Sequence, residues 1–271
     1  MRETSSESAV PDWEDTLPHF AVREAGSRIT APPLETSGSL GFMAVVGWAL
    51  WATASAAAAL YFNALGERDG PAWWVGFLVI VYLFLPPIIS DVTAAEARDQ
   101  FGQLATGYRL AAVPALSGIA AGLVVAGLRA GGFRCGVMAT AGGVFLIGAG
   151  VVALATWRGI RYTRRRQAWI TWMRHHGTPS PGSLRQVIFL KKWSDSNPQF
   201  RVLVEFAGPS GPQRVTANMI TTSRRVPRTG TAVLVTQVPH DPAAEPLIDL
   251  DQAAGPRFYP NHAEYEKPTG N

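Results

Sequence analysis

The chain is poor in cysteine, in lysine and, over four long stretches, in charge of any kind. Among its 271 residues, Cys135 is the only cysteine, so no disulfide can form within the chain. Lysine occurs only at positions 191, 192 and 267, so nearly all of the positive charge is carried by arginine. The net charge of +4 is distributed unevenly along the chain, and this unevenness predicts a membrane surface rather than nucleic acid as the partner.

Recognisable catalytic and metal-binding patterns are also missing. The sequence contains no HExxH, no GxSxG, no Walker loop and no GxGxxG. Of the five histidines, His175 and His176 are adjacent, and on a helix they point about 100° apart, which prevents easy sharing of one metal. We therefore predict a non-enzymatic protein with no cofactor and no metal.

Four apolar segments contain no Asp, Glu, Lys, Arg or His, and they run over residues 40–65, 71–90, 110–128 and 136–157. Each is close to the ~20 residues that cross a bilayer as a helix, and backbone groups in lipid must pair within their own helix. The pattern predicts four transmembrane helices within residues 40–157, with Pro86 and Pro87 kinking or ending the second. The absence of ionisable groups argues against an ion-coupled transporter.

Residues 1–39 are polar and acidic, with three arginines against seven acidic residues, a net charge of −4. Such a composition favours a disordered tail. Trp13, Leu17, Phe20 and Val22 are spaced roughly as one face of a short helix, so a docking motif is the alternative to a solvated tail.

Residues 158–176 carry six arginines and no acidic residue. By the positive-inside rule this segment lies in the cytoplasm, and four crossings place both termini there. We predict a basic juxtamembrane helix along the anionic leaflet, for which the acidic tail competes. Topology and surface adhesion are favoured over specific lipid or nucleic-acid binding. The predicted lipid contacts are Arg158, Arg161, Arg164, Arg165, Arg166, Trp169, Trp172 and Arg174.

Small residues recur at four-residue spacing on the third and fourth apolar segments. Such stripes let helices approach closely in lipid. We predict that they pack the third helix against the fourth, with homo-oligomer contact as the alternative. The residues are Gly118, Gly122, Ala126, Ala139, Gly143, Ala149 and Ala153.

Beyond a linker at residues 177–182, the hydrophobic period changes from helical to the two-residue repeat of strands. Strands are predicted at 184–193, 199–206, 213–220, 231–238 and, more weakly, 246–250. They indicate a small all-β cytoplasmic domain over residues 183–255, an antiparallel barrel or sandwich. Residues 256–271 are predicted to be a loose tail, although Phe258 and Tyr259 could dock.

This C-terminal part resembles the β module of a large bacterial family that is described only as a domain of unknown function. The matching elements are Gly177 and Gly182, the strand ending Val204-Glu205-Phe206, and the phrase from Val226 to Val235. The family's tyrosine-aspartate-proline element is reduced here to Asp241-Pro242. The resemblance implies a β module joined to transmembrane helices and carries no active site. Abundant alanine and glycine, with arginine in place of lysine, are typical of high-GC bacteria.

These observations predict an inner-membrane protein that presents the β module in the cytoplasm for protein interaction or scaffolding. The expected partners are the lipid bilayer and an unknown protein, with no nucleic acid. The alternative is an oligomeric pore or lipid-handling protein built from the four helices.

Overall fold

The computed structural model describes residues 16–32, 38–64, 73–208, 211–238, 241 and 244–268. The chain forms two compact units, which are described separately. The helical unit comprises residues 36–100 and 105–161. The β unit gathers three separate parts of the chain, namely residues 1–35, 101–104 and 162–271.

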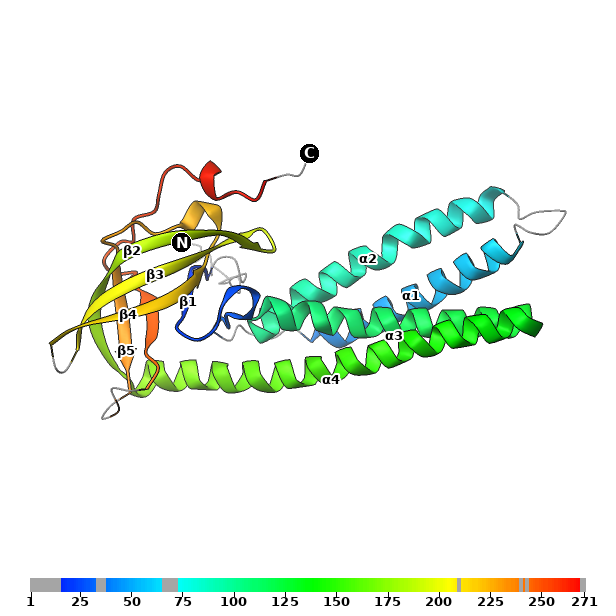
Figure 1. The fold of residues 1–271 in the computed structure, drawn as a ribbon, viewed down its shortest axis with the longest axis horizontal. Coiled ribbons are helices and arrows are strands. Elements are labelled where there is room, and N and C mark those ends of the chain that lie inside the picture. The colour runs from blue at the N-terminus through cyan, green and yellow to red at the C-terminus, as the bar shows by residue number, and fades with distance from the viewer. Residues whose placement is uncertain are drawn as a thin grey trace, which may run out of the picture. The chain divides into compact units, whose positions relative to one another are not determined.

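Four long helices are present (Figure 1), namely α1 (Ser39–Ala64), α2 (Trp73–Phe101), α3 (Leu104–Ala130) and α4 (Gly132–His176). In the described part of the chain, the spans long and apolar enough to cross a membrane are Ser39–Phe62, Leu104–Ala130 and Gly132–His176. This identifies a membrane protein. The predicted connection at 66–70 lies outside the described residues.

Of the two predictions for Pro86 and Pro87, a kink or the end of the helix, the second is wrong, because α2 continues through both prolines to Phe101. Proline removes one hydrogen-bond donor, yet a helix tolerates this loss where other contacts hold it. Ser90 provides one such contact, since its hydroxyl donates to the Pro86 carbonyl at 2.9 Å and accepts from Trp51 Nε1 of α1. The predicted loop at 91–109 is therefore almost entirely helical, with a break only around Gly102.

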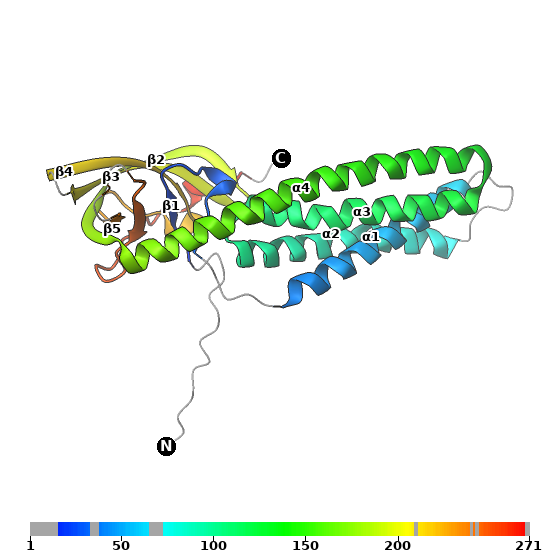
Figure 2. The same cartoon turned by 90° about the horizontal axis from the view of Figure 1, so that it is seen from below.

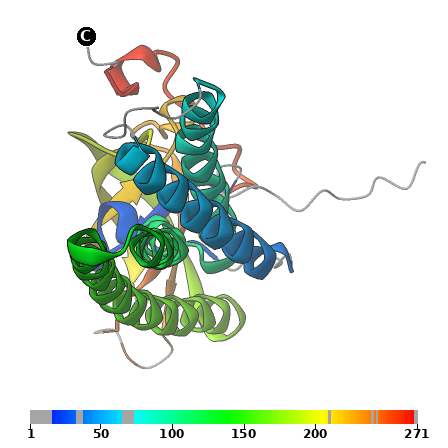
Figure 3. The ribbon, with the colours of Figure 1, turned by 90° about the vertical axis from the view of Figure 1, so that its right-hand side faces the viewer.

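Gly118 and Gly122 of α3 pack against α1, not against α4 as predicted. A Cβ atom at Gly118 would lie 2.6 Å from the Trp48 carbonyl oxygen, and one at Gly122 would lie 2.3 Å from the Ala52 carbonyl oxygen. Backbone atoms cannot move aside easily, so these glycines set the close approach of α1 and α3. Figures 2 and 3 show the four helices running alongside one another in this unit.

The contact between α3 and α4 uses other small residues. A Cβ atom at Gly142 would lie 3.1 Å from the Ala120 carbonyl oxygen, and one at Gly127 would lie 3.0 Å from Met138 Cβ. Gly143 has no atom within 4 Å of such a Cβ. Ala139 is exposed, whereas Ala126 and Ala149 are buried and Ala153 is half-buried. Sequence spacing located the small residues but not their partners.

The β unit is a six-stranded antiparallel sheet that curls into a nearly closed barrel (Figure 1). Its strands are β1 (His19–Ala21), β2 (Thr178–Ser194), β3 (Asn197–Gly208), β4 (Gly211–Ile220), β5 (Ala232–Gln237) and β6 (Leu247–Leu250). Their order is β1-β4-β3-β2-β5-β6. Short 3₁₀ helices lie at Gly26–Arg28, Ser223–Arg225 and Ala263–Tyr265. The predicted strands are confirmed, and of the two predicted architectures the barrel is present.

Side chains fill the barrel. On β3, the predicted alternation is confirmed, since Phe200, Val202, Val204 and Phe206 are buried while Arg201 is exposed. They join apolar residues of the other strands in one core cluster. An eight-stranded barrel is just wide enough to be filled by side chains or to hold one ligand, so a six-stranded barrel with this core is filled.

The predicted disordered tail is wrong for residues 16–32, because β1 pairs with β4 and Phe20 joins the barrel core. Leu17 and Ile29 are 1% and 2% exposed. The segment is thus neither a solvated tail nor, as the alternative predicted, a helix that docks on a partner, since it packs as a strand on the chain's own barrel. Trp13 lies outside the described residues.

Two predicted boundaries also change. No linker separates the last helix from the sheet, since α4 ends at His176 and β2 begins at Thr178. At the other end, Phe258, Tyr259 and Tyr265 pack against the barrel core, so the segment after residue 255 is docked. The barrel thus needs residues on both sides of the predicted range 183–255.

Candidate functional site

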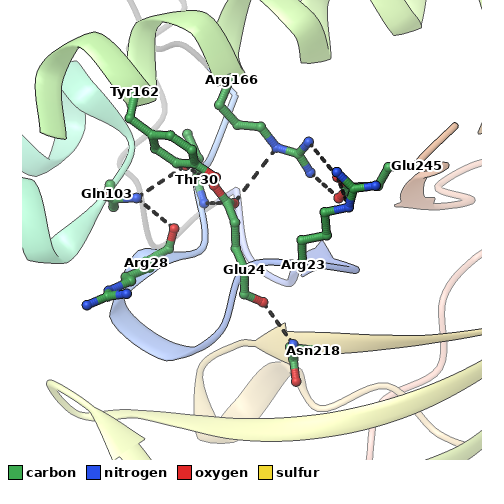
Figure 4. Close-up of polar contacts among 9 residues, drawn as sticks. All are labelled: Arg23, Glu24, Arg28, Thr30, Gln103, Tyr162, Arg166, Asn218 and Glu245. Carbon is green, nitrogen blue, oxygen red and sulfur yellow. Dashed lines mark hydrogen bonds and ion pairs between the residues drawn. The ribbon is translucent and has the colours of Figure 1, made fainter. Parts of the chain in front are cut away.

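A cluster of polar side chains in the β unit lies beside the seam where β1 and β6 approach each other. Glu24 follows β1, Glu245 precedes β6, and Tyr162 and Arg166 project from the last part of α4 (Figure 4). We call Glu24, Tyr162, Arg166 and Glu245 the seam cluster. It joins three parts of the chain that are far apart in sequence.

Arg166 holds the two carboxylates of the cluster. Its Nη1 and Nη2 donate to the two carboxylate oxygens of Glu245 at 3.1 and 2.5 Å. Its Nε lies 3.9 Å from Glu24 Oε2, a purely electrostatic contact that is too long for a hydrogen bond. The Trp169 ring packs under the guanidinium at 4.0 Å, a cation–π contact. With only 14% of its side chain exposed, Arg166 is committed to protein contacts.

Glu24 is the most buried member, with 4% of its side chain exposed. Its carboxylate accepts hydrogen bonds from Thr30 N at 2.8 Å, Thr30 Oγ1 at 2.9 Å and Tyr162 Oη at 2.6 Å. Three donors and a guanidinium compensate for the water that this carboxylate loses on folding. The backbone carbonyl of Glu24 accepts from Asn218 Nδ2 of β4 at 2.9 Å.

Residues 24–31 form a loop that also contacts the turn between α2 and α3. Gln103 Nε2 donates to the Arg28 carbonyl at 2.7 Å, and Ala31 N donates to the Gly102 carbonyl at 2.7 Å. Gly102 has φ +63°, and a Cβ there would lie 2.7 Å from the Ala31 carbonyl oxygen, so glycine is required twice over. The loop thus touches the barrel, the last part of α4 and the α2–α3 turn.

A second ion pair lies two turns further along α4. Arg174 Nη2 donates to Asp249 Oδ1 of β6 at 2.8 Å, and both side chains are partly exposed. Between the two arginines, Ile170 and Met173 are buried together with Leu247 of β6. Residues 162–176 are therefore an integral part of the β unit.

His19 lies buried on β1, 7% exposed, with its Nε2 3.0 Å from Thr16 Oγ1. Burial, and secondarily the charge of Arg174, lower the pKa of His19 to about 3. The imidazole is therefore neutral at physiological pH.

The arginines predicted to contact lipid fall into two groups. Arg158, Arg161, Arg164, Arg165 and Arg174 are exposed, and their contact with lipid stays a prediction. Arg166 is not available for lipid, and Trp169 is half-buried beneath it. Trp172 is 43% exposed and stacks on His176.

A break in the helix would be needed for residues 158–176 to lie along the bilayer surface. No residue of α4 departs from helix between Gly132 and His176, and 45 residues span about 68 Å. The predicted competition between the acidic N-terminal segment and lipid for these arginines stays a prediction. Among the described residues, Glu24 lies 3.9 Å from Arg166.

Sequence reasoning missed Glu24, Glu245 and Tyr162 as functional residues. Glu24 sits in a segment whose acidity resembles a solvated tail, and Glu245 lies in a polar loop. The one available signal was that residues 158–176 contain arginines and no acidic residue. If any of these arginines is buried, its acidic partner must come from another part of the chain.

The seam cluster joins α4, the loop after β1 and the segment before β6. Glu24 and Glu245 are both occupied by donors, and no group of three or more His, Cys, Asp or Glu side chains in the described residues could hold a metal. No family model, curated protein or solved structure matches the chain. The resemblance to a bacterial β-module family therefore stays a prediction.

Proposed function

We propose that this protein presents its β barrel at the cytoplasmic face of the inner membrane as a protein-interaction or scaffolding module. The observation that carries the proposal is the filled barrel, in which Leu184, Val204, Met219 and Val235 are fully buried. A barrel packed in this way has no chamber for a ligand, so its outer surface is the part that acts on other molecules.

The set of chain segments that form the β unit supports four crossings of the membrane. Residues 16–32 precede α1, residues 101–104 join α2 to α3, and residues 162–176 end α4, yet all three belong to one compact unit. Their ends therefore share one side of the membrane. The chain between residues 16–32 and residues 101–104 must then cross the membrane an even number of times. Since α1 supplies one crossing, α2 supplies the second.

The arginines of α4 support the cytoplasmic location. Arg158, Arg161, Arg164 and Arg165 lie next to the apolar part of α4 and are exposed. Lys and Arg within ~15–20 residues of a membrane segment determine its orientation. We therefore assign this end of α4, and the barrel with it, to the cytoplasm, where these arginines also meet anionic headgroups.

Site-specific photocrosslinking in native membranes tests the interaction role. A photoreactive amino acid replaces Ile188 or Leu234, which are 43% and 36% exposed on the barrel. The matched control is Phe133, 87% exposed at the start of α4, which the proposed topology places on the other side. We expect Ile188 or Leu234 to capture a protein that Phe133 does not. No protein adduct from the barrel positions would contradict the proposal.

A second candidate, an oligomeric pore or lipid-handling protein, is favoured by one feature of α4. Gly136, Gly143 and Gly150 recur every seven residues, and a Cβ atom added at any of them would meet no atom within 4 Å. Such an open stripe suits contact with another helix. This candidate predicts that the purified chain releases a trapped solute or moves lipid in vesicles, with no need of the exposed barrel positions.

A further inference from the structure

A groove on the barrel surface, separate from the seam cluster, is lined by two arginines. Two chain segments form it, and its volume is about 460 Å³. The lining residues are Arg228, Thr229, Gly230, Thr231, Ala232, Ala254, Gly255 and Arg257. Two arginines and two threonines thus share one hollow, and none of the lining residues is acidic.

Hydrogen bonds between the two segments hold the arginines in place. Arg228 N and Thr231 Oγ1 both donate to the Arg257 carbonyl, at 2.9 and 3.2 Å. Arg228 Nε donates to the Phe258 carbonyl at 2.9 Å, which orients the guanidinium and leaves its terminal nitrogens without a protein acceptor among the described residues. The Arg228 side chain and the backbone of Arg257 are therefore held in place, while the Arg257 side chain is exposed.

Neither arginine forms an ion pair with a described residue. The nearest acid in the sequence of the two segments, Asp251, uses Oδ1 to accept from Ala253 N and Ala254 N. Two guanidinium groups in one groove repel each other unless an anion lies between them. Arginine presents paired N–H donors that match the oxygens of a phosphate group.

Glycine leaves space for such a group to approach the backbone. Gly230 and Gly255 both have positive φ, +87° and +66°, and a Cβ at either would meet no atom within 4 Å. The groove is of the size that accommodates small molecules, ~300–1,000 Å³. This volume is larger than a single phosphate needs, so the groove also has room for a group attached to the phosphate.

We propose that this groove binds the phosphate group of a small molecule or lipid headgroup, with Arg228 and Arg257 as the charged contacts. The proposal is independent of the protein-interaction role, because it rests on the groove alone. A soluble phosphate compound and a phosphate headgroup share this chemistry, and the experiment separates them.

The test uses the full chain in nanodiscs. In the first arm, inorganic pyrophosphate is titrated calorimetrically against protein in zwitterionic nanodiscs. In the second, protein-free nanodiscs that contain phosphatidic acid are titrated against the same protein in zwitterionic nanodiscs. Each arm compares the wild type with Arg257→Gln and with Arg201→Gln. Arg201 is an exposed arginine of β3 away from the groove, so its variant removes the same charge.

We expect Arg257→Gln to weaken binding about tenfold or more, as for loss of a charged hydrogen bond, while Arg201→Gln leaves it within about twofold. Such a loss in the first arm identifies a soluble ligand, and a loss confined to the second identifies a headgroup. The exposed arginines of α4 also attract anionic lipid, so only the difference between the two variants counts. Absence of binding in both arms, or equal weakening by both variants, would overturn the proposal.

Discussion

At the scale of single residues, the burial of Arg166 is the decisive feature of the seam cluster. The guanidinium supplies the charge that lets Glu24 and Glu245 be 4% and 9% exposed. The presence of a buried ion pair is only weak evidence that the pair stabilises the fold. Removing one partner is nevertheless costly, because the charge of the other partner stays buried. The cluster therefore acts by holding α4 and the N-terminal loop in one register on the barrel.

Arg166→Met should lower the free energy of unfolding of the β unit by about 3–5 kcal/mol, because two buried carboxylates lose their counter-ion. Hydrogen exchange with mass spectrometry on barrel peptides measures this loss separately from the helices. Arg23→Met is the control, since Arg23 contacts Glu245 but is 76% exposed and should change stability by less than about 1 kcal/mol. Equal exchange in the two variants would show that the Arg166 contacts contribute little.

His19 makes the stability of the barrel depend on pH. Its pKa is about 3 in the folded chain and about 6.5 when unfolded, so the unfolded state binds more protons between these values. The contribution is fully present above pH ~6.5 and falls by up to ~1.4 kcal/mol per pH unit as the pH drops below it. Urea unfolding followed by circular dichroism in the strand region, from about pH 8 to pH 5, measures the slope.

His19→Gln should flatten that slope, whereas His262→Gln, at an exposed position, should keep it. A slope unchanged by His19→Gln would assign the pH dependence to other groups.

At the scale of elements, the packing of the helices depends on which glycine faces a backbone. A Cβ at Gly122 would lie 2.0 Å from Ser55 Oγ as well as close to the α1 backbone, while one at Gly143 would meet open space. We expect Gly122→Ala to destabilise the helical unit by about 1–3 kcal/mol, because α1 and α3 must separate. Gly143→Ala is the matched control. Thermal unfolding in detergent compares them, and equal midpoints would mean that α1 and α3 do not approach closely there.

At the scale of the whole molecule, the topology is open to a labelling test. In a Cys135→Ala background, a cysteine replaces either Arg134, at the α3–α4 end, or Gln252, on the barrel; both positions are exposed. An impermeant maleimide added to intact cells should label the first and spare the second, because the proposed crossing of α4 separates them. Reversed labelling would place the barrel outside the cell. Equal labelling would show that the two positions lie on the same side of the membrane, so that α4 does not cross it.

The local pattern of the sequence determined the elements of this protein. Uncharged runs predicted α1, α3 and α4, because a helix in lipid excludes charged side chains along its length. The alternation from Phe200 to Phe206 predicted β3, because a half-buried strand imposes a period of two residues. The predicted end of the helix at Pro86 and Pro87 is wrong, because α2 continues through both prolines, and its Ser90 accepts a hydrogen bond from Trp51 of α1.

Contacts between distant parts of the chain were decided only by the tertiary structure. Residues 19–21 are too few for a strand signal and become β1 because β4 offers an unpaired edge and the core offers a place for Phe20. Likewise, the spacing of Gly118 and Gly122 predicts a close helix contact but not that its partner is α1. Glu24 and Arg166 are 142 positions apart in the sequence. In the sequence alone, both charges are equally compatible with a solvated surface. Only the fold buries them, and no local pattern in the sequence predicts this burial.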